Sequence, residues 1–168
     1  MKLNLMLEQL LGLLSQETGL YHSLLAVIDK EKQAVSRSEL AALNEAGMEK
    51  ENILATLRKS DEQRRRLVAC LAEELGYPFR DLTLKKLSQL VDEPLAGRLQ
   101  QASTDLISVL SRVQEANQGT KQLFEHSLAL SRGAFNLLNE LISSNTVYYR
   151  TGNIHSSNST AKRVCSDI

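Results

Sequence analysis

The stretch that decides the fold is DEPLAGRLQQASTDLISVLSRVQEANQGTKQLFEHSLALSRGAFNLLNELISSN, residues 92–145. It contains no proline after Pro94, and apolar or small residues recur along it at alternating steps of four and three. This spacing predicts one long helix that packs along other helices through a continuous seam. The seam consists of Leu95, Leu99, Ala102, Leu106, Val109, Val113, Ala116, Thr120, Leu123, Ser127, Leu130, Ala134, Leu137 and Leu141.

In the second half of this stretch, apolar residues also occupy the faces beside the seam. Such a broad apolar surface predicts either burial within the protein's own bundle or capture of a partner helix. Under the first alternative these residues pack on the N-terminal helix. Under the second they form a binding surface, with the candidate residues Leu123, Phe124, Leu128, Leu130, Phe135, Leu138 and Ile142.

Two further long helices are predicted at the N-terminus, over residues 2–34 and 39–75. The first has the wide leucine stripe of a bundle helix. Glu17 and Glu31 interrupt that stripe, and we expect them at its edge with their carboxylates reaching water. Ser38 is the expected N-cap of the second helix. Because the turn is so short, the two helices should be antiparallel neighbours.

The connection to the last helix contains ordinary stop and start signals. Gly76, followed by Pro78, should end the second helix. Thr83 should cap a short helix from Leu84 to Val91, and Asp92 should cap the long helix with Pro94 in its first turn. That helix would have about 50 residues and would exceed both arms of the hairpin.

These elements together predict an all-α fold. We expect an elongated antiparallel helical bundle or coiled coil of three long helices plus one short helix, forming a single domain over residues 1–150. Residues 151–168 contain scarcely any large apolar side chain. We expect them to form a disordered C-terminal tail, because too little surface could be buried to offset the entropy of ordering.

Composition excludes several classes of function. The 20 basic and 20 acidic residues give a formal net charge of +0, which disfavours a nucleic-acid binder. No apolar run is long enough to span a membrane, and no secretory signal is recognised, so we expect a cytoplasmic protein without membrane insertion. Cys70 and Cys165 are not expected to form a structural disulfide.

Catalytic and metal-binding patterns are missing from the sequence. His22, His126 and His155 lie far apart, without metal-type spacing to a cysteine or to one another. No glycine-rich phosphate loop, nucleophile elbow or Cys-x-x-Cys pair occurs. We therefore expect no enzymatic activity, no metal and no cofactor.

A series of short motifs in order along the chain gives a more specific indication. The motifs are Glu17 with Tyr21 and Leu24-Leu25, Glu31-Lys32, Leu40 and Leu43, Lys50-Glu51, Ile53-Leu54, Arg64-Arg65, Leu84-x-x-Leu87, Asn117, Leu123, Ser127-Leu128, Leu137, Tyr148-Tyr149 and Gly152. In this order the series resembles the FlgN-type flagellar export chaperones over about residues 3–152. The long helix departs from the family in one place, since Asn117 is followed by Thr120 where the family often has a second asparagine.

The resemblance implies a cytoplasmic chaperone of the hook–filament junction proteins, also called hook-associated proteins. Such a chaperone binds the C-terminal amphipathic helices of its clients, prevents premature assembly and hands them to the flagellar type III export apparatus. Family members also contact the export gate through their C-terminal region. Tyr148 and Tyr149 are the candidates for that contact here, because tyrosine pairs supply a large contact area with few rotatable bonds. We expect a monomer or weak homodimer.

Two other functions remain open from the residues alone. A structural coiled-coil or adaptor protein with no secretion role would form a stable elongated homodimer and bind no amphipathic client. A helical-bundle enzyme or metal protein would bind a metal on purification.

Overall fold

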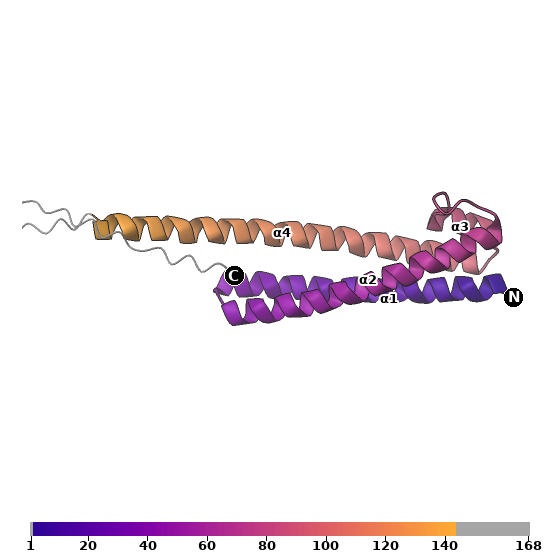
Figure 1. Ribbon diagram of the computed structural model, residues 1–168, viewed down its shortest axis with the longest axis horizontal. Coiled ribbons are helices and arrows are strands. Elements are labelled where there is room, and N and C mark those ends of the chain that lie inside the picture. Colours follow the sequence, from indigo (N-terminus) through magenta and orange to yellow (C-terminus); the bar gives the residue numbers. More distant parts are fainter. Residues whose placement is uncertain (1, 144–168) are drawn as a thin grey trace, which may run out of the picture. The chain divides into compact units, whose positions relative to one another are not determined.

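The computed structural model describes residues 2–143, which contain four helices and no strand (Figure 1). The helices are α1 (Lys2–Arg37), α2 (Leu40–Leu75), α3 (Leu84–Leu90) and α4 (Leu95–Ser143). The prediction of an all-α fold with three long helices and one short helix is confirmed. The predicted domain boundary at residue 150 and the predicted tail lie outside the described residues.

The chain divides into two compact units, residues 1–125 and 126–168. The division falls inside α4, so the first unit contains α1, α2, α3 and the beginning of α4. The described part of the second unit is the remainder of α4. Each unit is described by itself below.

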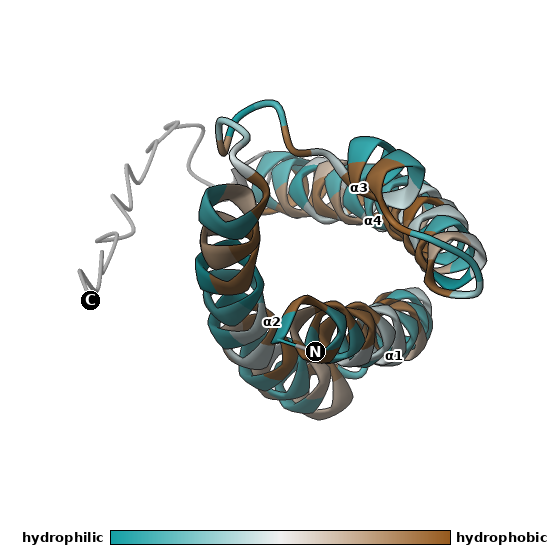
Figure 2. Cartoon of the chain, turned by 90° about the vertical axis from the view of Figure 1, so that its right-hand side faces the viewer, coloured by the Kyte–Doolittle hydropathy of each residue, from teal (hydrophilic) through white to brown (hydrophobic). Residues whose placement is uncertain are grey.

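Within the first unit, α1 and α2 form an antiparallel hairpin, as the short turn predicted (Figure 1). Brown and teal segments alternate along the long helices in Figure 2, which is the pattern of amphipathic helices. The apolar side of α1 is deeply covered, since Leu7, Leu10 and Leu14 are fully buried. Burial of each leucine stabilises the fold by about 1.5–3 kcal/mol relative to an exposed side chain.

The turn between α1 and α2 differs from the prediction at Ser38. This residue has a φ of 56° and follows α1 as its left-handed terminating residue. Its N–H donates to the carbonyl of Val35 (3.1 Å), and the N–H of Glu39 donates to the carbonyl of Ala34 (2.9 Å). These two hydrogen bonds form a Schellman motif. The prediction of Ser38 as N-cap of α2 is therefore wrong, because its N–H donates to the carbonyl of Val35 at the end of α1 and Glu39 has the N-cap position of α2.

The end of α2 has the same motif, and here the prediction is confirmed. Gly76 has a φ of 68°, and its N–H donates to the carbonyl of Glu73 (3.2 Å). The N–H of Tyr77 donates to the carbonyl of Ala72 (2.9 Å). Glycine fits this position because it has no Cβ to collide with the backbone at positive φ.

The start of α3 is as predicted, whereas that of α4 differs in detail. The hydroxyl of Thr83 accepts a hydrogen bond from the N–H of Lys86 (3.1 Å). At α4, the helix begins at Leu95, so Pro94 lies just before the helix rather than in its first turn. The carboxylate of Glu93 accepts a hydrogen bond from the N–H of Gly97 (3.3 Å) and so provides the side-chain acceptor expected of Asp92.

The hydrophobic core of the first unit joins all four helices. One cluster combines the leucines of α1 with residues of α2, the following loop, α3 and the first turns of α4. A smaller cluster lies nearer the hairpin turn, where Leu24, Ile28 and Leu57 are covered in part by Val113 and Ala116 of α4. The predicted seam of α4 is therefore confirmed within this unit. The first cluster consists of Met6, Leu7, Leu10, Leu11, Leu14, Leu71, Ala72, Leu82, Leu87, Leu99, Leu106 and Val109.

Candidate interaction surface on α4

Burial along α4 changes abruptly after Ser127. Up to that residue, the seam positions are buried or half-buried, including Leu99, Val109 and Thr120. Every position from Leu128 to Ile142 is exposed. The amphipathic pattern of the sequence thus continues past the point where the seam is covered.

The structure places the seven predicted surface residues in two groups. Leu123 is half-buried and Phe124 is 38% exposed, and both belong to the first unit. The other five lie in the second unit and have a larger exposed fraction, such as 51% for Leu128 and 71% for Ile142. The five are Leu128, Leu130, Phe135, Leu138 and Ile142.

Two exposed leucines belong to this part of α4 but were assigned from the sequence to the seam. Leu137 is 61% exposed and Leu141 is 63% exposed. The relevant signal was helix length, since α4 has 49 residues whereas α1 and α2 have 36 each. A helix of 36 residues is too short to cover the seam of a 49-residue helix along its whole length.

The exposed residues in the second unit lie on one side of the helix. At 100° per residue, they cover roughly half of the helix circumference. Arg132 and Glu140 project from the other half, so the apolar half carries no charge. We call this surface the exposed α4 face and define it by Leu128, Leu130, Phe135, Leu137, Leu138 and Ile142.

The interior of the α1–α2 hairpin contains buried charged side chains, whereas the exposed α4 face is apolar and carries no charge. Glu17 is only 3% exposed, and each of its carboxylate oxygens accepts a hydrogen bond from the Nε of Arg64 at 3.1 Å. The hydroxyl of Ser60 also donates to Glu17 (3.3 Å), and Arg64 forms a second ion pair with Asp61. Burial of polar groups is tolerated when partners are supplied in this way.

Glu31 forms a second buried pair nearer the turn. It is 7% exposed, and its carboxylate accepts a hydrogen bond from the Nζ of Lys50 at 2.7 Å. The expectation that Glu17 and Glu31 reach water at the edge of the seam is therefore wrong. Lys50 and Arg64 recur in α2 two heptads apart, as Glu17 and Glu31 do in α1, and each cation is the partner of one of these glutamates.

Tyr21 lies one turn beyond Glu17 and is affected by the same surroundings. Burial raises the pKa of its phenol, and the nearby carboxylates of Glu17 and Asp61 raise it further. Arg64 acts in the opposite direction. Tyr21 is thus expected to stay protonated to a higher pH than a tyrosine in water.

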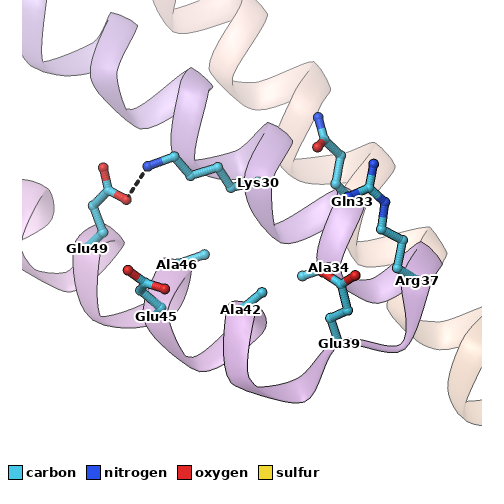
Figure 3. A pocket seen from close by; sticks show the side chains of 9 residues that line it. All are labelled: Lys30, Gln33, Ala34, Arg37, Glu39, Ala42, Glu45, Ala46 and Glu49. Carbon is cyan, nitrogen blue, oxygen red and sulfur yellow. Dashed lines mark hydrogen bonds and ion pairs between the residues drawn. The ribbon is translucent and has the colours of Figure 1, made fainter.

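A concave site in the first unit lies at the hairpin turn and is lined mainly by small or charged side chains. It has a volume of about 260 Å³, with Ala34, Ala42 and Ala46 between the helices and the Lys30–Glu49 ion pair (2.6 Å) at its rim (Figure 3). Within residues 2–143, no group of three or more His, Cys, Asp or Glu side chains is placed to hold a metal ion. His22 and His126 are among those residues, whereas His155 lies outside them.

Together, the fold and the exposed α4 face define an all-α protein that presents an amphipathic helix surface to solvent. The chain belongs to the FlgN family, since the family model described as FlgN protein matches residues 1–156. This membership confirms the resemblance seen in the sequence and assigns the chain to a family of flagellar export chaperones, which is not an enzyme family. No curated protein and no solved structure matches the chain. Among the described residues, no helix is both long and apolar enough to cross a membrane.

Proposed function

We propose that this protein is a cytoplasmic export chaperone that binds the C-terminal amphipathic helices of hook-associated proteins through the exposed α4 face. Binding prevents premature assembly of these clients at the hook–filament junction. The chaperone then hands them to the flagellar type III export apparatus. Membership of the FlgN family supports the general role, and the exposed α4 face supports the position of the client.

The observation that carries the proposal is the exposure of a charge-free apolar helix surface. Phe135 is 64% exposed, and leucines and an isoleucine surround it on the same half of the helix. Exposed apolar patches of this kind mark interaction sites, and an amphipathic partner helix binds such a surface through side chains spaced at three and four residues. A client helix with this spacing would cover the apolar half and leave Arg132 and Glu140 in solvent.

The size of the surface is compatible with reversible binding. Complete burial of one leucine or phenylalanine contributes about 1.5–3 kcal/mol. Association costs roughly 4–15 kcal/mol in lost freedom of motion. Several half-exposed side chains therefore leave a moderate net affinity, which suits a chaperone that must release its client.

The proposal extends to the export gate through Tyr148 and Tyr149. Both tyrosines lie outside the described residues. Deletion of residues 146–168 should weaken binding to the gate component while client binding is retained. Loss of client binding in this truncated protein would contradict the division of roles between the exposed α4 face and the tyrosine pair.

A substitution on the exposed α4 face tests client binding directly. Phe135→Ser and Leu138→Ser should each weaken binding of a hook-associated protein's C-terminal segment at least tenfold by isothermal titration calorimetry, which corresponds to about 1.4 kcal/mol. Ile107→Ser is the matched control, because Ile107 is also on α4 and is 65% exposed but lies outside the exposed α4 face. Circular dichroism should show the same helix content in all three variants.

Two results would overturn the proposal. One is unchanged client affinity in Phe135→Ser and Leu138→Ser proteins that retain their helix signal. The other is a stable homodimer, found by analytical ultracentrifugation, that depends on Phe135 and binds no client segment. The second result would favour the structural coiled-coil or adaptor function instead.

A further inference from the structure

The two buried ion pairs of the hairpin follow a common register. Glu17 and Glu31 lie two heptads apart in α1, and Lys50 and Arg64 lie two heptads apart in α2 in the reverse order. In the antiparallel hairpin, each glutamate therefore meets one cation. The same spacing that lets the leucines of a heptad repeat face one another also lets these four charges face one another.

Leucines alone do not define this register, because a heptad repeat looks similar after a shift of seven residues. Such a shift in one direction would place Glu17 opposite Leu57 and Glu31 opposite Leu43. A shift in the other direction would place Glu17 opposite Leu71, and Glu31 would then face Leu57. In either case both carboxylates would be buried against leucine, without a cation, which is strongly unfavourable.

The charges also discriminate between partners for α1. The interruptions of the α1 seam are both acidic, so a second copy of α1 could not neutralise Glu17 and Glu31. The exposed α4 face carries no charge and could not do so either. An apolar amphipathic helix from another protein would meet the same obstacle. α2 presents Lys50 and Arg64 at the required spacing and in contact with these two glutamates.

We propose that the Glu17–Arg64 and Glu31–Lys50 pairs determine both the register and the partner of the α1–α2 hairpin. Their role is to keep an apolar seam closed to other amphipathic helices in a protein that exposes another apolar surface. Buried polar or ionic groups at single seam positions are known to fix register and oligomeric state in coiled coils, often at a cost in stability. The proposal concerns the hairpin alone and does not depend on which client binds α4.

A variant with a fully apolar seam tests this role. Glu17→Leu, Glu31→Leu, Lys50→Leu and Arg64→Leu are combined in the full-length chain. Replacement of buried ion pairs by apolar residues is often neutral or stabilising, so the midpoint of urea unfolding should be unchanged or higher. Register and partner choice should nevertheless be lost, which would appear as a mixture of hairpin registers or as a larger mass in solution.

Register is measured with two spin labels across the hairpin. The labels are placed by Gln16→Cys and Gln63→Cys at exposed positions, with Cys70→Ser and Cys165→Ser removing the native thiols. Double electron–electron resonance should give one distance in the parent protein. In the apolar variant, a second population should appear, with the labels displaced along the helix axis by one heptad, or about 10 Å.

The neighbouring exposed ion pair provides the matched control. Lys30 and Glu49 also join α1 to α2, and the separation in sequence equals that of Glu31 and Lys50. Their side chains are 58% and 44% exposed, so they do not interrupt the buried seam. Lys30→Leu combined with Glu49→Leu replaces one ion pair by two leucines at exposed positions and should keep one distance and the parent mass. A mixture of registers in this control would overturn the proposal, because added hydrophobicity alone would then explain the effect.

A charge exchange covers the case in which the apolar variant fails to fold. Glu31→Lys alone places two lysines opposite each other in the seam and should change the label distance or the mass in solution. Adding Lys50→Glu restores opposite charges and should restore both parent values. The proposal is overturned if the single reversal keeps the parent distance and mass, or if the apolar variant folds with one unchanged distance and an unchanged mass.

Discussion

The Nε of Arg64 in α2 lies 3.1 Å from both carboxylate oxygens of Glu17 in α1, inside the hairpin seam. The side chain of Glu17 is 4% exposed and that of Arg64 is 29% exposed, so one partner is enclosed and the other keeps contact with water. Removal of either residue leaves a charge behind, but the cost depends on which charge remains. This asymmetry gives a prediction for the single substitutions.

Arg64→Ala should destabilise the protein more than Glu17→Ala does. Loss of the arginine leaves the buried carboxylate of Glu17 with only the hydroxyl of Ser60, whereas loss of the glutamate leaves Arg64 paired with Asp61. Breaking a buried pair typically costs about 3–5 kcal/mol, and we expect this range for Arg64→Ala and about 1–2 kcal/mol less for Glu17→Ala. The free energy of unfolding in urea measures both values. Equal losses below about 1 kcal/mol would show that the pair is effectively solvated.

The left-handed residues that terminate α1 and α2 make a second, matched prediction. Gly76→Ala forces a Cβ into a backbone with φ of 68°, and the protein should lose about 1 kcal/mol or more of stability. Ser38 already carries a side chain at φ of 56°, so Ser38→Gly should relieve this strain and raise stability by up to about 1 kcal/mol. Thermal unfolding of both variants gives the signs. A stabilising Gly76→Ala would contradict the assigned conformation.

The helices could be predicted from the sequence because their signals are local. Leucine periodicity, Gly76 before Pro78 and Thr83 before a short apolar run each act within a few residues. The exceptions were also local. Ser38 can cap either helix, and the choice between them depends on which backbone groups the turn leaves unsatisfied. At the start of α4, Glu93 and Asp92 are adjacent carboxylates, and either could accept a hydrogen bond from the first turn. The structure has Glu93 in this role.

The buried ion pairs could not be predicted from either helix alone. A glutamate in a leucine seam resembles an edge residue until the register of its partner is known. The sequence signal for these pairs is that Glu17 and Glu31 are separated by the same number of residues as Lys50 and Arg64. The length of the last helix predicted that part of its apolar seam would be exposed. The point where burial ends, after Ser127, depends on tertiary packing and could not be predicted from the sequence.

The phenol of Tyr21 predicts a change in stability at high pH. Burial raises its pKa above 10.0, the ordinary value, so the folded protein retains a proton that the unfolded chain releases. The unfolded state therefore binds fewer protons above about pH 10, and the free energy of unfolding falls as the pH rises through this range. Tyr21→Phe removes the titrating group and should make this fall shallower. Urea unfolding of both proteins at pH 9 and pH 11 measures the difference, and an equal fall in both would contradict the assignment.

Leu99 and Leu137 both belong to the predicted apolar seam of α4 but should respond differently to truncation. Leu99 is fully buried in the first unit, so Leu99→Ala leaves a cavity and should cost about 2–5 kcal/mol. Leu137 is 61% exposed, and Leu137→Ala should change the free energy of unfolding by less than about 0.5 kcal/mol. A large loss for Leu137→Ala would mean that another part of the protein covers this residue in solution. In that case a client helix could bind the exposed α4 face only after a rearrangement. Substitutions that stabilise the folded protein should then lower the association rate of the client.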